Sequence, residues 1–275
     1  MNIREIYVKT ASELTEISGD FAKKESEEII CFVCECLRSD IYLNQKTEIS
    51  QNRILQIQEI VSRRKTGKPL AYCMNSKYFY DREFFVDTNV LIPRHDTEIL
   101  VETVLKNEDC GKKFVLELGT GSGIISQILQ SKRSDWRIIS IDISFEAAKI
   151  AKKNCDEKIF IVNCDKFSAI TEQNVFDIIV SNPPYIQSAE IENLDDSVKN
   201  YEPRIAIDGG KNGCYFYEYL ARTAKKLLNE YGKIYCEIGF NQADIVPQIF
   251  LGHNFTQVET TKDFGGNPRV VCVRN

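Results

Sequence analysis

Asn182 is followed by Pro183, Pro184 and Tyr185, directly after the apolar run at 176–180. Proline fixes φ and has no N–H group to donate, so we expect a rigid backbone at the end of a strand. A carboxamide oxygen and a neighbouring main-chain carbonyl can each accept one N–H of a planar NH₂ group, and an aromatic ring can pack flat against it. Taken alone, the four residues are also typical of an ordinary turn. In a strand-end context they predict a site that holds a planar NH₂ group.

A glycine-rich loop lies upstream, between the apolar run at 114–118 and a helical stretch that starts at Ile124. Its glycines let the backbone turn sharply and approach a ligand closely, while the helix that follows presents free N–H groups. Because position 124 is Ile, the spacing is GxGxG, whereas a dinucleotide-binding loop has GxGxxG. This spacing predicts a nucleoside-type cofactor without a pyrophosphate, bound by Glu117, Gly119, Thr120, Gly121, Ser122 and Gly123.

Asp142 ends the next strand-like run, IISID at 138–142. A carboxylate at that place can accept hydrogen bonds from both hydroxyls of a ribose. The alternative is that Asp142 only caps the helix that follows. The glycine loop and the strand context together favour the ribose.

Composition limits the kinds of partner. The chain has 275 residues, 43% of them apolar, and a formal net charge of −5. It therefore lacks the basic excess that binds nucleic acid through its phosphates. The ten cysteines are spread irregularly and the N-terminal sequence has no apolar signal core, so we expect reduced thiols and a cytoplasmic protein. Neither a metal-ligand spacing of Cys and His nor a membrane-length apolar run occurs in the sequence.

The order of the elements predicts how these residues are positioned. Helical periodicity dominates residues 1–70, and residues 71–95 are rich in aromatic and β-branched side chains, which predicts a β-hairpin joining two domains. Asp96 is then expected to cap a helix. Strand-like runs alternate with helical stretches over residues 96–275, which predicts a parallel sheet with helices on both faces, the doubly wound α/β fold. These runs lie at 114–118, 138–142, 158–162, 176–180 and 233–238.

The glycine loop, the acidic strand end and the Asn-Pro-Pro-Tyr stretch together resemble the S-adenosylmethionine-dependent methyltransferases that modify planar nitrogen atoms. Three further segments resemble the bacterial-type peptide chain release factor N5-glutamine methyltransferases: LIPRHDTE at 91–98, EPRIAIDGGKNG at 202–213 and DFGGNPR at 263–269. The resemblance covers nearly the whole chain. It implies a Rossmann-like class I methyltransferase domain, preceded by a small helical domain at 1–70 that recognises the substrate.

The resemblance also implies roles for individual residues. Asn182 would supply a side-chain acceptor and Pro183 a main-chain carbonyl to the substrate NH₂ group. Pro184 would keep the loop rigid, and Tyr185 would pack flat on the planar amide. Asn182 would also adjoin the cofactor, S-adenosylmethionine, and Asp165 would meet the adenine amino group.

Two positions depart from the family. Trp commonly follows the acidic residue, whereas this chain has Lys166 and then Phe167, so that the stem of the lysine or the ring of the phenylalanine would have to cover the adenine. Pro usually stands where this chain has His95, a change expected to loosen that turn.

The implied reaction transfers a methyl group from S-adenosylmethionine to N5 of the glutamine in the Gly-Gly-Gln loop of class I peptide chain release factors, which modulates translation termination. The protein would act as a monomer, with a release factor as partner and with no membrane or direct nucleic-acid binding. The alternatives are a glutamine methyltransferase of a ribosomal protein, an adenine or guanine N-methyltransferase acting on DNA or rRNA, and a non-catalytic binding module. The acidic catalytic domain favours a protein substrate.

Overall fold

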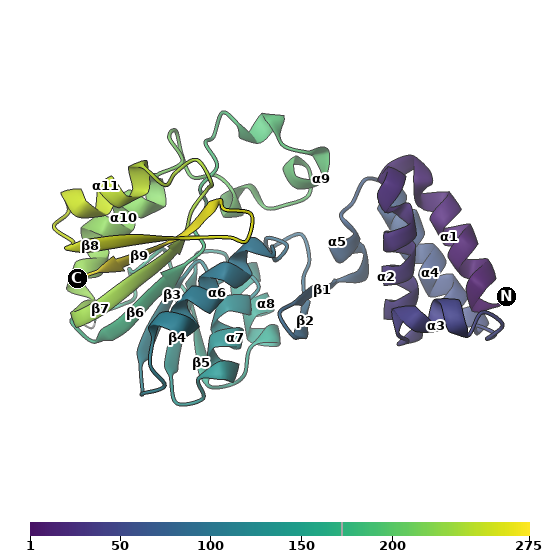
Figure 1. Ribbon diagram of the computed structural model, residues 1–275, viewed down its shortest axis with the longest axis horizontal. Coiled ribbons are helices and arrows are strands. Elements are labelled where there is room, and N and C mark those ends of the chain that lie inside the picture. Colours follow the sequence, from purple (N-terminus) through teal and green to yellow (C-terminus); the bar gives the residue numbers. More distant parts are fainter. Residues whose placement is uncertain (172) are drawn as a thin grey trace. The chain divides into compact units, whose positions relative to one another are not determined.

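The computed structural model describes residues 1–171 and 173–275. The chain divides into two compact units (Figure 1). The helical unit comprises Met1–Ser76 together with Asp195–Tyr201, and the sheet unit comprises Lys77–Leu194 together with Glu202–Asn275. Each unit buries an apolar core of its own, as expected of a domain.

In the helical unit, α1 (Ile3–Ser18) begins at a side-chain cap. Asn2 accepts a hydrogen bond from the Glu5 main-chain N at 2.9 Å, and the Glu5 carboxylate accepts one from the Asn2 main-chain N at 3.0 Å. These bonds satisfy N–H groups that have no partner inside the helix. The unit contains α1 (Ile3–Ser18), the 3₁₀ helix η1 (Gly19–Phe21), α2 (Ala22–Cys34), α3 (Arg38–Leu43), α4 (Gln51–Lys65), α5 (Leu70–Met74) and α9 (Asp196–Lys199).

Apolar side chains spaced three or four residues apart on α1, α2 and α4 form the core of the helical unit. Its fully buried members include Ile6, Leu14, Ile29, Ile30, Ile41 and Ile57. The half-buried thiols of Cys31, Cys34 and Cys36 pack against this core. Burial raises the pKa of each of the three thiols, which favours the neutral, unreactive form.

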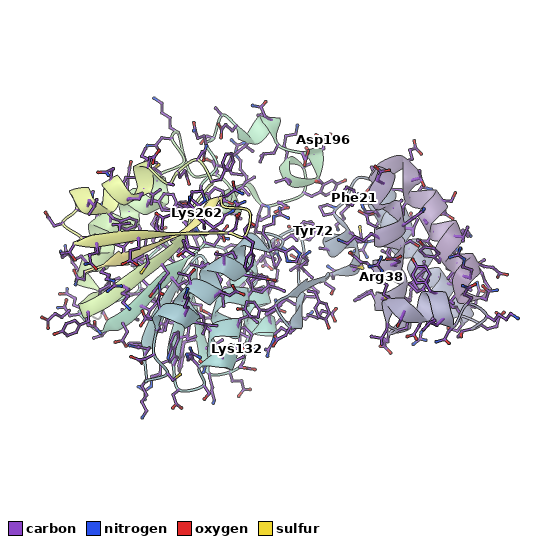
Figure 2. All side chains as sticks on the ribbon, in the orientation of Figure 1. Phe21, Arg38, Tyr72, Lys132, Asp196 and Lys262 are labelled. Atoms are coloured by element: carbon purple, nitrogen blue, oxygen red, sulfur yellow. The ribbon has the colours of Figure 1, made fainter. Side chains whose placement is uncertain are left out.

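The basic residues at the end of α4 have partners within the helical unit. Arg64 forms an ion pair of 3.0 Å with Glu25, and Arg63 donates a hydrogen bond of 2.8 Å to the main-chain oxygen of Tyr72. Phe21 and Arg38 carry their side chains on the surface of this unit (Figure 2). Arg63 and Arg64 thus have structural partners at the carboxyl end of α4, where cations are also favoured by the helix dipole.

The sheet unit is built on a seven-stranded sheet in the order β5-β4-β3-β6-β7-β9-β8. The first five strands in this order run parallel, and β9 is antiparallel to both of its neighbours. The strands are β3 (Phe114–Leu118), β4 (Arg137–Asp142), β5 (Ile159–Asn163), β6 (Phe176–Ser181), β7 (Leu228–Glu237), β8 (Gln257–Lys262) and β9 (Pro268–Arg274).

The five strands expected from the sequence are present, but the sheet is mixed and not wholly parallel. Strands β8 and β9 were not expected from the sequence. Strand β8 lies at the edge, and its burial pattern is mostly exposed, so it lacks a continuous apolar run. Strand β9 is apolar at Val270–Val273 but is preceded by a tight turn and not by a helix, which gives the antiparallel pairing.

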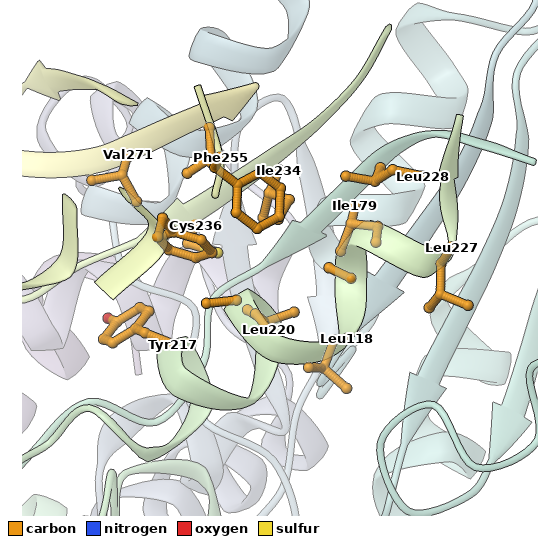
Figure 3. Packing of buried hydrophobic residues seen from close by; sticks show 14 of the residues in the cluster. Leu118, Ile179, Tyr217, Leu220, Leu227, Leu228, Ile234, Cys236, Phe255 and Val271 are labelled. Atoms are coloured by element: carbon orange, nitrogen blue, oxygen red, sulfur yellow. The ribbon is translucent and has the colours of Figure 1, made fainter. Parts of the chain in front are cut away.

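Helices cover both faces of the sheet, and alternate residues along each strand point to opposite faces. On one face, Tyr217 and Leu220 of α10 pack against Ile234, Cys236 and Val271 (Figure 3). The opposite face packs against α6 and α7. The helices of this unit are α6 (Asp96–Asn107), α7 (Ile124–Lys132), α8 (Phe145–Asn154), α10 (Tyr215–Thr223) and α11 (Ile245–Gly252), with 3₁₀ turns η2 (Ile191–Asn193), η3 (Arg204–Ala206) and η4 (Ala224–Lys226).

The expected β-hairpin forms from β1 (Ser76–Phe79) and β2 (Arg82–Phe85). Phe79 and Phe84 bury their rings in the core that α6 and α7 cover. Asn154 then joins the hairpin to the glycine loop, because its Nδ2 donates to the main-chain oxygens of Phe85 (2.8 Å) and Ser122 (2.9 Å). Within the described residues, no helix is long and apolar enough to cross a membrane.

Candidate active site

A cavity of about 180 Å³ lies in the sheet unit, beyond the carboxyl ends of β3, β4 and β6. The three sequence motifs meet there because the loops that follow these neighbouring strands adjoin one another. Of the predicted site residues, the cavity is lined by Gly119, Thr120, Gly121, Ser122, Asp142, Asp165, Lys166, Asn182, Pro183 and Pro184. Glu117, Gly123 and Tyr185 do not line it.

The glycine loop needs its glycines for two different reasons. Gly119 and Gly121 have φ of 76° and 54°, a region that residues with a Cβ rarely adopt, and a Cβ on either would meet no atom within 4 Å. The space beside them is therefore open to a ligand. At Gly123 a Cβ would lie 2.5 Å from Sγ of Cys155 and 3.2 Å from Cα of Ala151, so this glycine permits close packing of α7 on α8.

Glu117 supports the loop from beneath. Its side chain is fully buried, and its Oε2 accepts hydrogen bonds from Thr120 Oγ1 at 2.7 Å and from Ser126 Oγ at 2.5 Å. Among the described residues, Oε1 has no hydrogen-bond partner. Burial raises the pKa of Glu117 to about 7, although the two hydroxyls oppose this change.

Asp142 lines the cavity at the end of β4. Its Oδ2 accepts a hydrogen bond from the main-chain N of Gly121 and its Oδ1 one from that of Ser144, both at 2.8 Å. Burial raises the pKa of Asp142, and these two N–H groups counteract it. The following helix, α8, is capped by Ser144, whose Oγ accepts from the main-chain N of Ala147. Asp142 is therefore not the helix cap that the sequence left open as an alternative.

Lys166 and Phe167 have different surroundings. Phe167 is 7% exposed and packs in the core, 5.5 Å from the ring of Tyr219. Lys166 lines the cavity, with its Nζ 2.7 Å from Asp165 and 5.6 Å from the ring centre of Tyr215. Of the two residues considered for covering an adenine, only Lys166 is at the cavity.

Asn182 follows β6 directly and its orientation is set by a side chain from α6. Asn182 Nδ2 donates a hydrogen bond of 3.0 Å to Thr97 Oγ1. The carboxamide oxygen lies on the other side of the planar group and is left for a ligand of the cavity. Ser181 fixes the strand end, because its Oγ donates to the main-chain oxygen of Leu118 at 2.7 Å.

Tyr185 is held behind the cavity wall. Its half-buried ring packs against the core, and its hydroxyl lies 3.5 Å from Oε1 of Glu237. Burial raises the pKa of Tyr185, and the nearby carboxylate of Glu237 adds to this effect. Tyr185 was expected to pack flat against an acceptor amide. In this structure it is not among the residues that line the cavity.

Comparison with known proteins shows the family to which the chain belongs. Residues 94–198 match the methyltransferase small domain and residues 5–74 match the PrmC N-terminal domain. A release factor glutamine methyltransferase of Clostridium acetobutylicum is 36% identical over 98% of this chain and 98% of its own length. One of Francisella tularensis is 38% identical over 90% of this chain and 88% of its own. The chain belongs to the release factor glutamine methyltransferase family.

The fold of the chain is also that of a methyltransferase, as expected of a release factor glutamine methyltransferase. A solved methyltransferase of Pyrococcus furiosus, 18% identical, aligns with a TM-score of 0.53 over 82% of this chain and 98% of its own. This likeness concerns the fold alone. The resemblance stated from the motifs and the Rossmann-like class I methyltransferase fold are both confirmed.

In this member of the release factor glutamine methyltransferases, the segment 207–213 holds the Asn-Pro-Pro-Tyr loop. The main-chain N of Ile186 donates to the oxygen of Ile207 (3.1 Å), and the main-chain N of Gly209 donates to the oxygen of Ile186 (2.8 Å). A Cβ at Gly209 would lie 2.7 Å from Cα of Tyr185. The resemblance to the family identified this glycine-rich segment, but its contacts with the loop are visible only in the structure.

Gln242 is a second support that the sequence did not reveal. Its Nε2 donates to the main-chain oxygens of Tyr185 (3.2 Å) and Gly213 (3.1 Å), and its Oε1 accepts from the main-chain N of Gly239 (2.9 Å). A glutamine after a strand carries no local signal, because its partners come from distant parts of the chain. These bonds hold the loop after β6 to the loop after β7.

The start of α6 differs from the expectation for Asp96. The helix begins at Asp96, and the preceding His95 is its N-cap residue without a side-chain hydrogen bond. Asp96 instead forms an ion pair of 3.0 Å with Arg269. His95 is 82% exposed at its side chain and the turn is closed by main-chain bonds from Thr97 to Arg94 and from Glu98 to His95. The turn is therefore formed with histidine in place of proline.

Proposed function

We propose that this protein transfers a methyl group from S-adenosylmethionine to the side-chain nitrogen N5 of the glutamine in the Gly-Gly-Gln loop of class I peptide chain release factors. The proposal rests on one observation above the others. The glycine loop, Asp142 and the carboxamide of Asn182 line one cavity, in a chain of the release factor glutamine methyltransferase family.

The residues at this cavity fit the cofactor. The open space beside Gly119 and Gly121 admits a ligand close to the main chain, and Asp142 offers a held carboxylate to the hydroxyls of a ribose. Asp165 and Lys166 line the same cavity, and we assign Asp165 to recognising the adenine and the stem of Lys166 to covering it. When bound, S-adenosylmethionine supplies a methyl group on a positively charged sulfur.

The residues of the chain act by holding the acceptor. An amide nitrogen is a poor nucleophile because its lone pair is delocalised into the carbonyl. Asn182 Oδ1 and the Pro183 carbonyl each accept one N–H of the substrate, which turns the face of the amide that carries the nitrogen lone pair toward the methyl group. The nitrogen becomes cationic as its bond to carbon forms and the bond between carbon and sulfur breaks, which leaves a neutral thioether. The nitrogen then loses a proton to water, so no strong base is required. The prolines keep the acceptors in place, and alignment of the two reactants is the main contribution to the rate.

The remaining assignments also belong to the proposal. Residues 1–70 recognise the release factor, residues 71–95 form a linker, and residues 96–275 carry out the transfer. The protein acts as a monomer in the cytoplasm without direct nucleic-acid contact, in keeping with its acidic net charge. In this structure Tyr185 packs behind the residues that line the cavity, so its assignment to the flat side of the acceptor amide rests on the family resemblance alone.

A transfer assay tests the function. Purified protein is incubated with labelled S-adenosylmethionine and a class I release factor, and the site of any added methyl group is located by mass spectrometry. We expect one methyl group on the glutamine of the Gly-Gly-Gln loop, and its loss with Asn182→Ala. Transfer only to a ribosomal protein, or only to DNA or rRNA, would replace this function by one of the alternatives. Binding of the cofactor without transfer to any of these substrates would indicate a binding module.

A further inference from the structure

The hydroxyl of Thr97 connects Asn182 to the interior of the sheet unit. Thr97 lies in the first turn of α6 and is 1% exposed, and its Oγ1 accepts the hydrogen bond from Asn182 Nδ2 at 3.0 Å. A threonine hydroxyl carries one proton of its own and can donate it while it accepts from another group. The Thr97 proton is therefore available for an acceptor on the side away from Asn182.

The carboxyl group of Glu237 is that acceptor. Glu237 ends β7 and is 1% exposed, and the Thr97 hydroxyl is within hydrogen-bonding reach of its carboxyl group and favours the ionised form. Oε1 faces the hydroxyl of Tyr185 at 3.5 Å. Oε2 has no hydrogen bond of good geometry among the described residues, so the buried carboxylate still requires a donor.

These contacts decide which group donates and which accepts in the hydrogen bonds that connect Asn182, Thr97 and Glu237. An ionised carboxylate can only accept, so Thr97 must donate to Glu237. The oxygen of Thr97 then meets the NH₂ side of Asn182 and not its oxygen. If the carboxamide turned over, two oxygens would face each other without a proton between them, or Glu237 would lose its donor. Either arrangement leaves a buried polar group unsatisfied.

We propose that Thr97 and Glu237 are positioning residues that fix the direction of the Asn182 carboxamide, so that its oxygen faces the acceptor amide. The inference rests on the proposed function. A reversed Asn182 would point its N–H groups at an N–H of the substrate, so the substrate would lose one of the two acceptors that orient its nitrogen toward the methyl group. The correct direction is therefore a condition of reactivity and not only of binding.

The orientation of the Asn182 carboxamide also depends on pH. Burial raises the pKa of Glu237 to about 7. The charged and titratable groups that face Glu237 from the elements around it are Asp96 of α6, Arg269 of β9, Tyr185 of the loop after β6 and Tyr217 of α10. Below its pKa, Glu237 carries a proton and can donate to Thr97, which frees the Thr97 proton for a reversed Asn182. We expect kcat to rise with pH through about 7, and to lose this rise in Glu237→Gln.

Substitutions at Thr97 separate positioning from packing. Thr97→Val keeps the shape and removes the hydroxyl, and we expect kcat to fall about ten- to a hundredfold with little change in KM, as for a misplaced reacting group. Thr97→Ser keeps the hydroxyl and should restore kcat to within about threefold of the original, since the hydrogen bonds are retained. If Thr97 acted only by packing, kcat would fall more in Thr97→Ser, which lacks the methyl group, than in Thr97→Val, which keeps the shape.

Thr103→Val is the matched control. Thr103 is buried on the same helix, and its hydroxyl donates to the main-chain oxygen of Ile99 at 2.7 Å, away from the cavity lining. We expect this variant to keep the original kcat. Equal losses in Thr97→Val and Thr103→Val, or full activity of Thr97→Val, would overturn the proposal.

A second readout does not require turnover. In a nitrogen-15 NMR spectrum, the side-chain NH₂ signals of Asn182 are assigned by their absence in Asn182→Asp. One of the two protons should exchange slowly with solvent in the original protein and in Thr97→Ser, and rapidly in Thr97→Val. Unchanged exchange in Thr97→Val overturns the positioning proposal. Failure of the original protein to methylate a release factor, with these exchange differences present, would overturn the proposed function and not the orientation of Asn182.

Discussion

Lys166 combines an unusual backbone with three partners at the edge of the cavity. Its φ is 50°, and its Nζ contacts Asp165 and lies 5.6 Å and 5.5 Å from the ring centres of Tyr215 and Tyr219. These contacts hold the aliphatic stem beside the space assigned to the adenine. Because Phe167 packs in the core, we propose the stem of Lys166 as the cover of the adenine.

At the residue scale, this arrangement predicts the effect of shortening Lys166. Lys166→Ala should weaken cofactor binding about tenfold or more, because two or more buried CH₂ groups are lost. Lys166→Met keeps most of the stem and should retain affinity to within about threefold on the same basis. Calorimetric titration with S-adenosylmethionine measures both.

Lys225→Ala serves as the control for the loss of a lysine over an aromatic ring. Lys225 lies 5.5 Å from the ring centre of Phe255 and is not among the residues lining the cavity. Its removal should leave the dissociation constant unchanged. An affinity of Lys166→Ala equal to that of the original protein would show that the stem does not cover the cofactor.

At the scale of elements, the loop after β6 depends on a segment that carries no chemistry. Gly209 lies so close to this loop that a Cβ would be 2.7 Å from Cα of Tyr185 and 2.8 Å from the main-chain oxygen of Pro184. Both are main-chain atoms, which cannot move aside as a flexible side chain does. The direct hydrogen bonds between 207–210 and 186–188 leave little freedom for adjustment.

Gly209→Ala should therefore destabilise the sheet unit by about 1–3 kcal/mol and lower kcat, because the loop that presents Asn182 is displaced. Urea unfolding followed by the fluorescence of Trp136, the single tryptophan, reports on this unit, since Trp136 is buried in its core. Gly252→Ala is the control, because a Cβ there would meet no atom within 4 Å. Equal midpoints for the two variants would contradict the close approach at Gly209.

At the scale of the whole molecule, two fully buried carboxyl groups connect stability to pH. Burial raises the pKa of both Glu117 and Glu237 to about 7, from an ordinary value of 4.5. In the range between these values the folded state binds more protons than the unfolded chain. Their contribution to stability is therefore complete below about pH 4.5 and is lost as the pH rises through about 7.

The free energy of unfolding of the sheet unit should fall by about 1–3 kcal/mol per carboxyl group between pH 5 and about pH 8. Glu237→Gln should reduce this slope, since glutamine does not titrate. Glu146→Gln, which changes an exposed carboxylate on α8, should keep it. Trp136 fluorescence in urea at several pH values measures all three proteins. A slope that is the same in Glu237→Gln as in the original protein would exclude this residue as its source.

The sequence by itself determined the alternation of the five parallel strands with helices, the family and the loops that carry the site. Strand periodicity and the glycine spacing are local properties of the chain, and the rule that ligands bind at the carboxyl ends of parallel strands then places Gly119, Asp142 and Asn182 at one edge. The five strands of the central sheet were predictable for the same reason. The antiparallel β9 was not, because pairing between strands is not encoded in the pattern of one strand.

Only the tertiary structure decided which side chains support the motifs. Thr97 and Asn182 are 85 residues apart in sequence, and Tyr185 and Glu237 are 52 apart. Their contacts exist because α6 packs on the sheet and because β6 and β7 are neighbours in it. Likewise, the burial of Phe167 beside Tyr219 and the exposure of Lys166 to the cavity follow from packing in three dimensions. Sequence patterns reflect local periodicity, whereas the direction of a single carboxamide depends on hydrogen bonds between distant segments.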